Sequence, residues 1–181
     1  MSAPAPLAAR LASLFPAFKG LVYALLLLNI LIFFMADDAL VPHKAVDQIG
    51  WVIILAGLEW DSRAARSASV IGWSLAIELV GYACALYALG HYIAEIDWLE
   101  IINASAWLLI ALLLWLDILV PRIGASRPVG VMRALLYAAT LVCAILFGVQ
   151  GKLLDFYDSV LWIVCFFVIE LNILRLSRSA G

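Results

Sequence analysis

Residues 98–120, WLEIINASAWLLIALLLWLDILV, form an apolar run that is long enough to cross a bilayer as one helix, which needs about 20 residues. Within it, Asn103 lies four residues before Trp107, and Asp117 lies ten residues after that Trp. The same spacing returns twice elsewhere, in the sets Asp47, Trp51, Asp61 and Asp158, Trp162, Asn172. The chain therefore contains three related units of about 55 residues each.

A second apolar stretch precedes each Trp and carries Tyr23, Tyr82 or Tyr137. Each unit is therefore predicted to form a hairpin of two helices. The predicted fold is all-α and integral to a membrane, with six transmembrane helices at 20–35, 46–58, 70–92, 98–120, 129–149 and 159–174. These helices form three pseudo-repeated hairpins, at 18–66, 67–124 and 128–178. A four-helix count is the alternative if the short second and sixth helices are only partly inserted.

The composition of the chain supports the prediction of a membrane protein. The chain is 67% hydrophobic and 13% charged, with a mean hydropathy of +1.11. Soluble domains average about 45–50% apolar and about 25% charged residues. The formal net charge of −2 gives no indication of nucleic-acid binding.

The basic residues predict the orientation. Nine of the eleven lie on one side of a six-helix arrangement, namely Arg10, Lys19, Arg63, Arg66, Arg122, Arg127, Arg133, Arg175 and Arg178. Only Lys44 and Lys152 lie on the other side. Cytoplasmic loops are rich in Lys and Arg, so both termini are expected in the cytoplasm. The expected location is a bacterial inner membrane.

The N-terminal segment 1–17 is expected to be an interfacial amphipathic helix that Pro16 separates from the first span. A frayed polar tail is the alternative. Residues 18–181 are expected to form a single transmembrane domain.

Polar residues inside a membrane are costly and indicate function by default. Glu78 lies near the middle of the predicted third helix, and Tyr82 lies one turn further on the same face. Asn29 lies in the first helix and is expected to donate a hydrogen bond to Glu78. A protonated Glu78 that only joins helices is the structural alternative.

Each even-numbered predicted helix also carries an acid in its cytoplasmic third, followed by an Arg about one turn on. The pairs are Glu59 with Arg63, Asp117 with Arg122, and Glu170 with Arg175. One reading is an ion pair that closes each helix. The other is a ring of acids that lines a cation path. On the opposite side, an acidic outer mouth is expected from Asp47, Asp97, Glu100 and Asp158.

The histidine and cysteine residues give little indication of a catalytic or metal-binding site. His43 and His91 fall at equal depth on different hairpins, and ligation of a haem or chlorin is weighed against an ordinary interfacial position. The three Cys show no metal spacing and are expected to pack as small apolar groups. No cofactor or metal is expected.

Two resemblances follow from these patterns. Leu28-Asn29, Glu59 and Arg63 resemble the first two helices of a voltage-sensor-type cation channel, and the stretch 166–170 with Arg175 has a similar look. That family's gating helix, with Arg at every third position, is absent, so a voltage sensor is not expected. The arrangement of three hairpins is similar to the urea/amide channel family in architecture only.

Function is expected to be non-enzymatic, because no nucleophile–base set is visible. The leading hypothesis is a channel or transporter for a cation, a proton or a small polar solute, acting as a homo-oligomer in the lipid bilayer. The alternative is a non-catalytic subunit or scaffold of a larger membrane complex.

Overall fold

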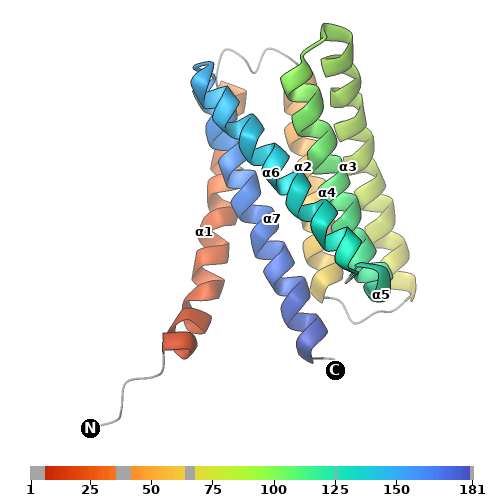
Figure 1. Ribbon diagram of the computed structural model, residues 1–181. Helices are drawn as coiled ribbons and strands as arrows, with labels where there is room; N and C mark the ends of the chain where they lie inside the picture. Colours follow the sequence, from red (N-terminus) through yellow and green to blue (C-terminus); the bar gives the residue numbers. More distant parts are fainter. Residues whose placement is uncertain (1–6, 36–41, 64–67, 125, 180–181) are drawn as a thin grey trace.

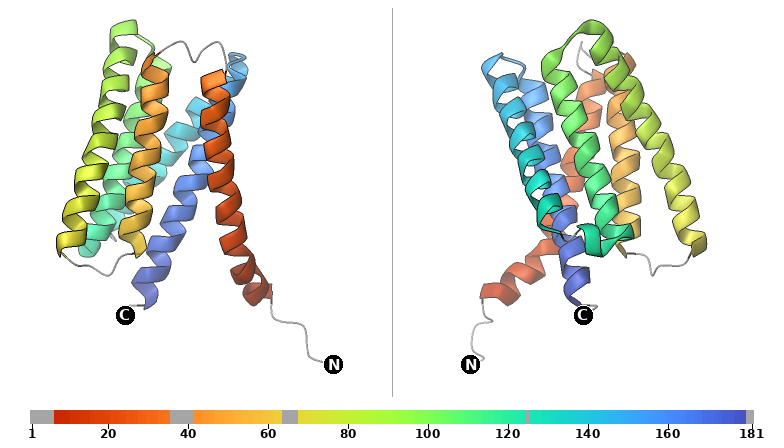
Figure 2. Two further views of the ribbon diagram at one scale, coloured as in Figure 1. Left: turned by 180° about the vertical axis from the view of Figure 1, so that it is seen from behind. Right: turned by 45° about the vertical axis from the view of Figure 1, so that its right-hand side comes forward.

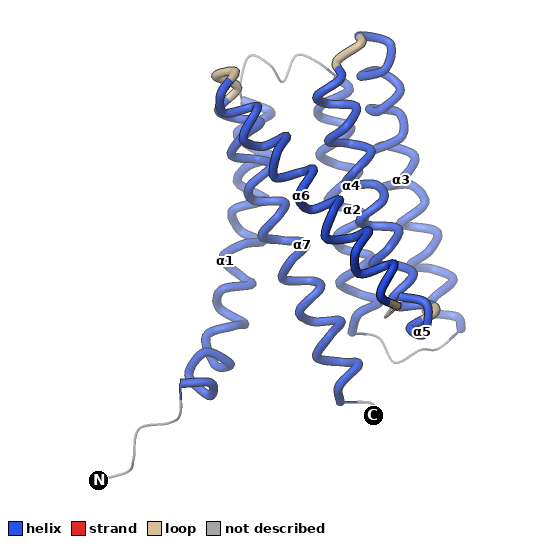
Figure 3. Tube along the Cα trace, viewed as in Figure 1, coloured by secondary structure: helices blue, strands red, loops and turns tan. Residues whose placement is uncertain are grey.

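The computed structural model describes residues 7–35, 42–63, 68–124 and 126–179, and nearly all of them are helical (Figure 3). The helices are α1 (Leu7–Met35), α2 (Pro42–Arg63), α3 (Ala68–Glu95), α4 (Trp98–Leu119), α5 (Pro121–Gly124), α6 (Arg127–Val149) and α7 (Leu153–Ser179). No strand occurs in these ranges. The all-helical prediction is confirmed for them.

The three helices that carry the regularly spaced Trp residues form the centre of the bundle. Helices α2, α4 and α7 all contact one another. Each remaining long helix lies against two of them: α1 against α7 and α2, α3 against α2 and α4, and α6 against α4 and α7. Figures 1 and 2 show this arrangement, with α1 beginning and α7 ending at the same end of the bundle.

The core is aromatic where the central helices meet. Trp51, Trp107 and Trp162 are only 4–5% exposed, and Phe166 is fully buried among them. The Phe166 ring centroid lies 5.0 Å from that of Trp107 and about 6.1 Å from those of Trp51 and Trp162. These Trp residues therefore pack the interior and do not form part of an aromatic belt. The strongly exposed Trp60, Trp73 and Trp98 lie near helix ends, where such a belt is expected.

Glycine brings α2 and α3 together in the most extensive interface of the bundle. A Cβ on Gly50 would lie 2.7 Å from Cys84 Cβ, and one on Gly81 would lie 2.8 Å from the carbonyl oxygen of Gly50. Both distances are too short for a side chain at either position. Glycine thus permits a close approach of the two helices, as it commonly does in membranes. The interface joins the first and second predicted hairpins.

Among the described residues, three helices are long and apolar enough to cross a membrane, over Trp73–Glu95, Trp98–Asp117 and Arg127–Val149. Their apolar windows are only 22–39% buried inside the protein. Most of this apolar surface consequently faces outward, and hydrocarbon is the solvent that matches it. The chain is thus built for integration into a membrane.

Pro16 does not separate the N-terminal segment from the first predicted span, contrary to expectation. Helix α1 continues through Pro16. A proline removes one backbone hydrogen bond, but helices in membranes tolerate this where the freed groups find other partners. The short helix α5, between α4 and α6, was not predicted.

Candidate functional site

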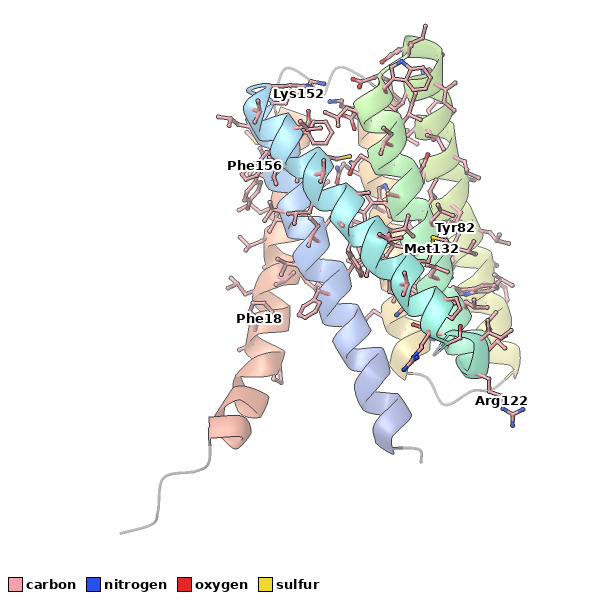
Figure 4. The ribbon with its side chains drawn as sticks, viewed as in Figure 1. Phe18, Tyr82, Arg122, Met132, Lys152 and Phe156 are labelled. Atoms are coloured by element: carbon pink, nitrogen blue, oxygen red, sulfur yellow. The ribbon has the colours of Figure 1, made fainter. Side chains whose placement is uncertain are left out.

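Polar side chains gather in two adjoining cavities between α2, α4 and α7, toward the end of the bundle that carries Lys152 (Figure 4). The polar residues that line them are Lys44, Asp47, Gln48, Tyr92, Glu100, Asn103, Asp155, Asp158 and Ser159. We call this site the polar chamber. Three of its residues, Asp47, Asn103 and Asp158, hold the position four residues before a Trp in the regular spacing. The structure therefore brings together side chains that are about 55 residues apart in the chain.

Asp158 is the most heavily bonded acid of the chamber. The side-chain amide of Asn29, on α1, donates a hydrogen bond to its Oδ1. The amide of Gln48, on α2, donates to its Oδ2 at 3.0 Å. The two donors come from different helices, so Asp158 links α1, α2 and α7.

The chamber holds more acids than bases. Lys44 Nζ lies 3.4 Å from Asp155 Oδ1 and 3.7 Å from Glu100 Oε1. On the opposite side, the Tyr92 hydroxyl donates to Asp47 Oδ2 at 3.2 Å. With Asp47 and Asp158, four carboxyl groups and one ammonium group therefore line the chamber.

Several oxygens of the chamber lack donors within the described part of the chain. They are Asp47 Oδ1, Gln48 Oε1 and Asn103 Oδ1, together with Asn29 Oδ1 beside Asp158. A buried acceptor without a hydrogen bond costs roughly 1–3 kcal/mol. These oxygens are therefore suited to a ligand that is a cation or a hydrogen-bond donor.

Each cavity has a volume of about 30 Å³. A single water occupies about 30 Å³ in the liquid, so the space suits a water or a small bare ion. One of the cavities is also lined by Trp51, Trp107, Trp162 and Phe166. This aromatic layer forms the floor of the chamber and separates it from the apolar core beyond.

The same end of the bundle holds a second group of polar residues, where α2 begins and α3 ends. The rings of His43 and His91 are stacked, with centroids 5.0 Å apart and planes within 7°. His43 Nε2 lies 3.9 Å from Glu95 Oε2. Burial lowers the pKa of His43; the charge of Glu95 opposes this, while His91 and Lys44 add to it. Two histidines that bind one tetrapyrrole point their ring nitrogens at it from opposite sides. The stacked rings of His43 and His91 do not point at each other in this way, which argues against the haem or chlorin hypothesis.

Asp97 caps the beginning of α4 at the surface of the protein. Its side chain accepts a hydrogen bond from the backbone N–H of Glu100 at 3.2 Å, and its Oδ2 lies 3.4 Å from Lys152 Nζ. Partial burial acts to raise the pKa of Asp97, but the Glu100 N–H and the charge of Lys152 outweigh it, so the pKa is lowered. Of the four residues expected at the outer mouth, Asp47, Glu100 and Asp158 line the chamber, and Asp97 remains at the surface.

Glu78 lies away from the chamber. Its carboxyl group is fully buried, and a Cβ on Gly57 would lie 2.4 Å from its Oε1. Glu78 is therefore packed closely against the backbone of α2. Tyr82, one turn further along α3, packs against the apolar core. Neither residue lines the two cavities of the chamber.

The predicted bond from Asn29 to Glu78 is wrong. Helix α1 packs on α2 and α7, while Glu78 lies on α3. Asn29 is fully buried and its amide reaches Asp158. Helix order along the chain did not indicate that α1 would close the bundle against α7.

The inner acids have separate partners from neighbouring helices. Tyr23, on α1, donates a hydrogen bond to Glu59 Oε2 at 2.7 Å. Asp117 binds Arg133, on α6, at 2.7 Å, and the predicted pairing with Arg122 is wrong, because Arg122 is exposed and points away from the bundle (Figure 4). Glu170 lies on α7, but its side chain is outside the described part, as is that of Arg63. Glu59 and Asp117 therefore give no support to a shared ring of inner acids, which stays a prediction.

Sequence reasoning missed Lys44, Gln48, Tyr92, Asp155 and Ser159 as chamber residues. Lys44 and Asp155 lie three residues before Asp47 and Asp158 and share their helix faces, so helical spacing could have indicated these two. Gln48 and Ser159 directly follow the two acids, and helical spacing does not place them on those faces. Tyr92 carried no such signal, because it reaches Asp47 from a different helix.

No protein-family model, no curated protein and no solved structure matches this chain.

Proposed function

We propose that this protein is a small transporter that binds a monovalent cation or a proton in the polar chamber and carries it across a bacterial inner membrane. All six long helices span the membrane in this proposal, with both termini in the cytoplasm. The protein then consists of three hairpins around a pseudo-threefold axis, each contributing one of Asp47, Asn103 and Asp158.

One observation carries the proposal: four carboxyl groups and a single ammonium group line a cavity about the size of one water, and the ammonium group lies near two of the four. Such a site has more acidic than basic groups, so it would bind a positive charge. Acceptor oxygens without donors supply ligands for it, as hard cations prefer oxygen. The volume favours a bare cation or a proton over a polar organic solute.

The aromatic floor supports a transporter rather than an open channel. Trp51, Trp107, Trp162 and Phe166 line the chamber on its inner side. Release toward the cytoplasm would require these rings to move. Such a movement would follow from small shifts of α2, α4 and α7, and a homo-oligomer would support the bundle in the bilayer while they occur.

Flux in liposomes tests this function. The purified protein is reconstituted, and uptake of protons, Na⁺ and K⁺ is measured against a potential. We expect Asp158→Asn and Asp47→Asn each to lower flux at least about tenfold, because losing a charged ligand costs more than 1.4 kcal/mol. Glu78→Gln is the matched control, a buried carboxyl outside the chamber, and should retain flux within about twofold.

The outcomes separate the hypotheses. A loss of flux in Glu78→Gln, with normal flux in the chamber variants, would move the path away from the chamber. Flux in the native protein no higher than in empty liposomes would reject transport.

A non-catalytic membrane subunit is the second candidate, and one observation favours it. An open apolar groove of about 650 Å³ lies between α1, α6 and α7. Phe18, Tyr137, Leu141, Ile163 and Phe167 are among the residues that line it. In this reading a transmembrane helix of a partner subunit fills the groove, and Leu141→Trp would release that subunit without altering the chamber.

A further inference from the structure

The outer ends of α2 and α3 bring together the only two histidines of the chain. Together with Glu95 they place three ligand atoms within 4.8 Å of one another. His91 and Glu95 are one turn apart on α3 and so lie on the same face of that helix. His43 faces them from the second residue of α2.

We propose that His43, His91 and Glu95 bind a divalent first-row transition metal of the zinc class. Two imidazoles and one carboxylate are a ligand set of mononuclear zinc sites, which leave the fourth position to water. Imidazole selects zinc, copper, nickel or iron, whereas magnesium and calcium prefer oxygen alone. This site therefore takes a different cation from the oxygen-lined chamber, and it does not rest on the proposed transport function.

Metal binding requires the ligands to move. The two imidazole rings are stacked nearly parallel, so one of them must turn before both ring nitrogens point at the same metal. Ligand atoms of a tetrahedral zinc lie about 3.4 Å apart, since each is about 2.1 Å from the metal. His43 Nε2 and Glu95 Oε2 are already at 3.9 Å. Glu95 is exposed, so its side chain is free to rotate inward and the metal has a path from the outer surface.

Neighbouring aromatic rings contact both imidazoles. Tyr87 packs edge-on against His91 with ring centroids 4.7 Å apart, and Tyr92 packs against His43 at 5.4 Å. His43 itself is 4% exposed.

Cobalt titration of the full chain, purified without a histidine tag, tests the site. Co²⁺ reports its ligands through visible absorption, and Zn²⁺ is then added in competition. We expect one Co²⁺ per chain, displaced by Zn²⁺, with affinity at least about 100-fold weaker in His43→Ala and His91→Ala. Glu95→Gln should weaken binding about tenfold, and Tyr87→Phe, which keeps the ring, should stay within about twofold.

A second measurement guards against variants that fold poorly. Zn²⁺ should raise the Tm of the native protein, because a ligand that binds only the folded state stabilises it. Since Glu95 is exposed, Glu95→Gln should fold normally and lose most of this rise. Binding as tight in both histidine variants as in the native protein would overturn the proposal. So would an intense near-ultraviolet thiolate band, which would assign the metal to cysteine.

Discussion

Replacing Arg133 by Ala is expected to destabilise the protein by about 3–5 kcal/mol, because it leaves Asp117 buried without its counter-charge. The guanidinium of Arg133 lies 2.7 Å from Asp117, and both side chains are almost fully buried, at 8% and 12% exposed. The pair joins α4 to α6. Reversible unfolding in mixed micelles measures the loss.

Arg122→Ala is the matched control for this prediction. Arg122 is the basic residue nearest to Asp117 in the sequence, but it is exposed. Its replacement should change the free energy of unfolding by less than about 0.5 kcal/mol. A double variant, Arg133→Met with Asp117→Leu, should recover part of the loss, because it removes both charges. Equal losses from Arg122→Ala and Arg133→Ala would contradict the assigned pairing.

Replacing Gly81 by Leu is expected to destabilise the protein by about 3 kcal/mol through overpacking of the α2–α3 interface. A Cβ at this position would lie 2.8 Å from the carbonyl oxygen of Gly50 and 2.8 Å from Ile54 Cγ1. Backbone cannot move aside as a flexible side chain can, so the two helices would have to separate. The same unfolding measurement reports the effect.

Gly90 offers a control on the same helix. It is exposed, and a Cβ there would meet nothing within 4 Å. Gly90→Leu should be neutral or stabilising by up to about 1 kcal/mol, since Leu has the higher helix propensity. Matching losses at Gly81 and Gly90 would show that the α2–α3 contact does not govern stability.

The apolar runs predicted the positions of the helices well, because hydropathy depends only on the local sequence. The apolar runs at 70–92, 98–120 and 129–149 lie within or nearly coincide with α3, α4 and α6. The predicted spans 46–58 and 159–174 are shorter than α2 and α7, since polar residues extend these helices beyond the apolar stretch. Hydropathy indicates where a helix meets hydrocarbon, and hydrogen bonding decides where it ends.

The site was predicted only in part. Asp47, Glu100 and Asp158 were recognised as acids of the outer side, but they were expected at a mouth rather than around a buried chamber. Greater weight was given to Glu78, because a carboxyl group at mid-helix is the costliest residue in a membrane. The sequence did not indicate that glycine would bring the backbone of α2 against it.

The sequence by itself determined the helical, membrane-suited composition of this protein and the regular spacing of Trp51, Trp107 and Trp162. Only the tertiary structure decided that the polar residue before each Trp faces the same cavity, that Asn29 bonds Asp158, and that Arg133 rather than Arg122 neutralises Asp117. The reason is physical. Spacing along one helix determines which side chains share a face, whereas partners on different helices depend on how close the helices can pack.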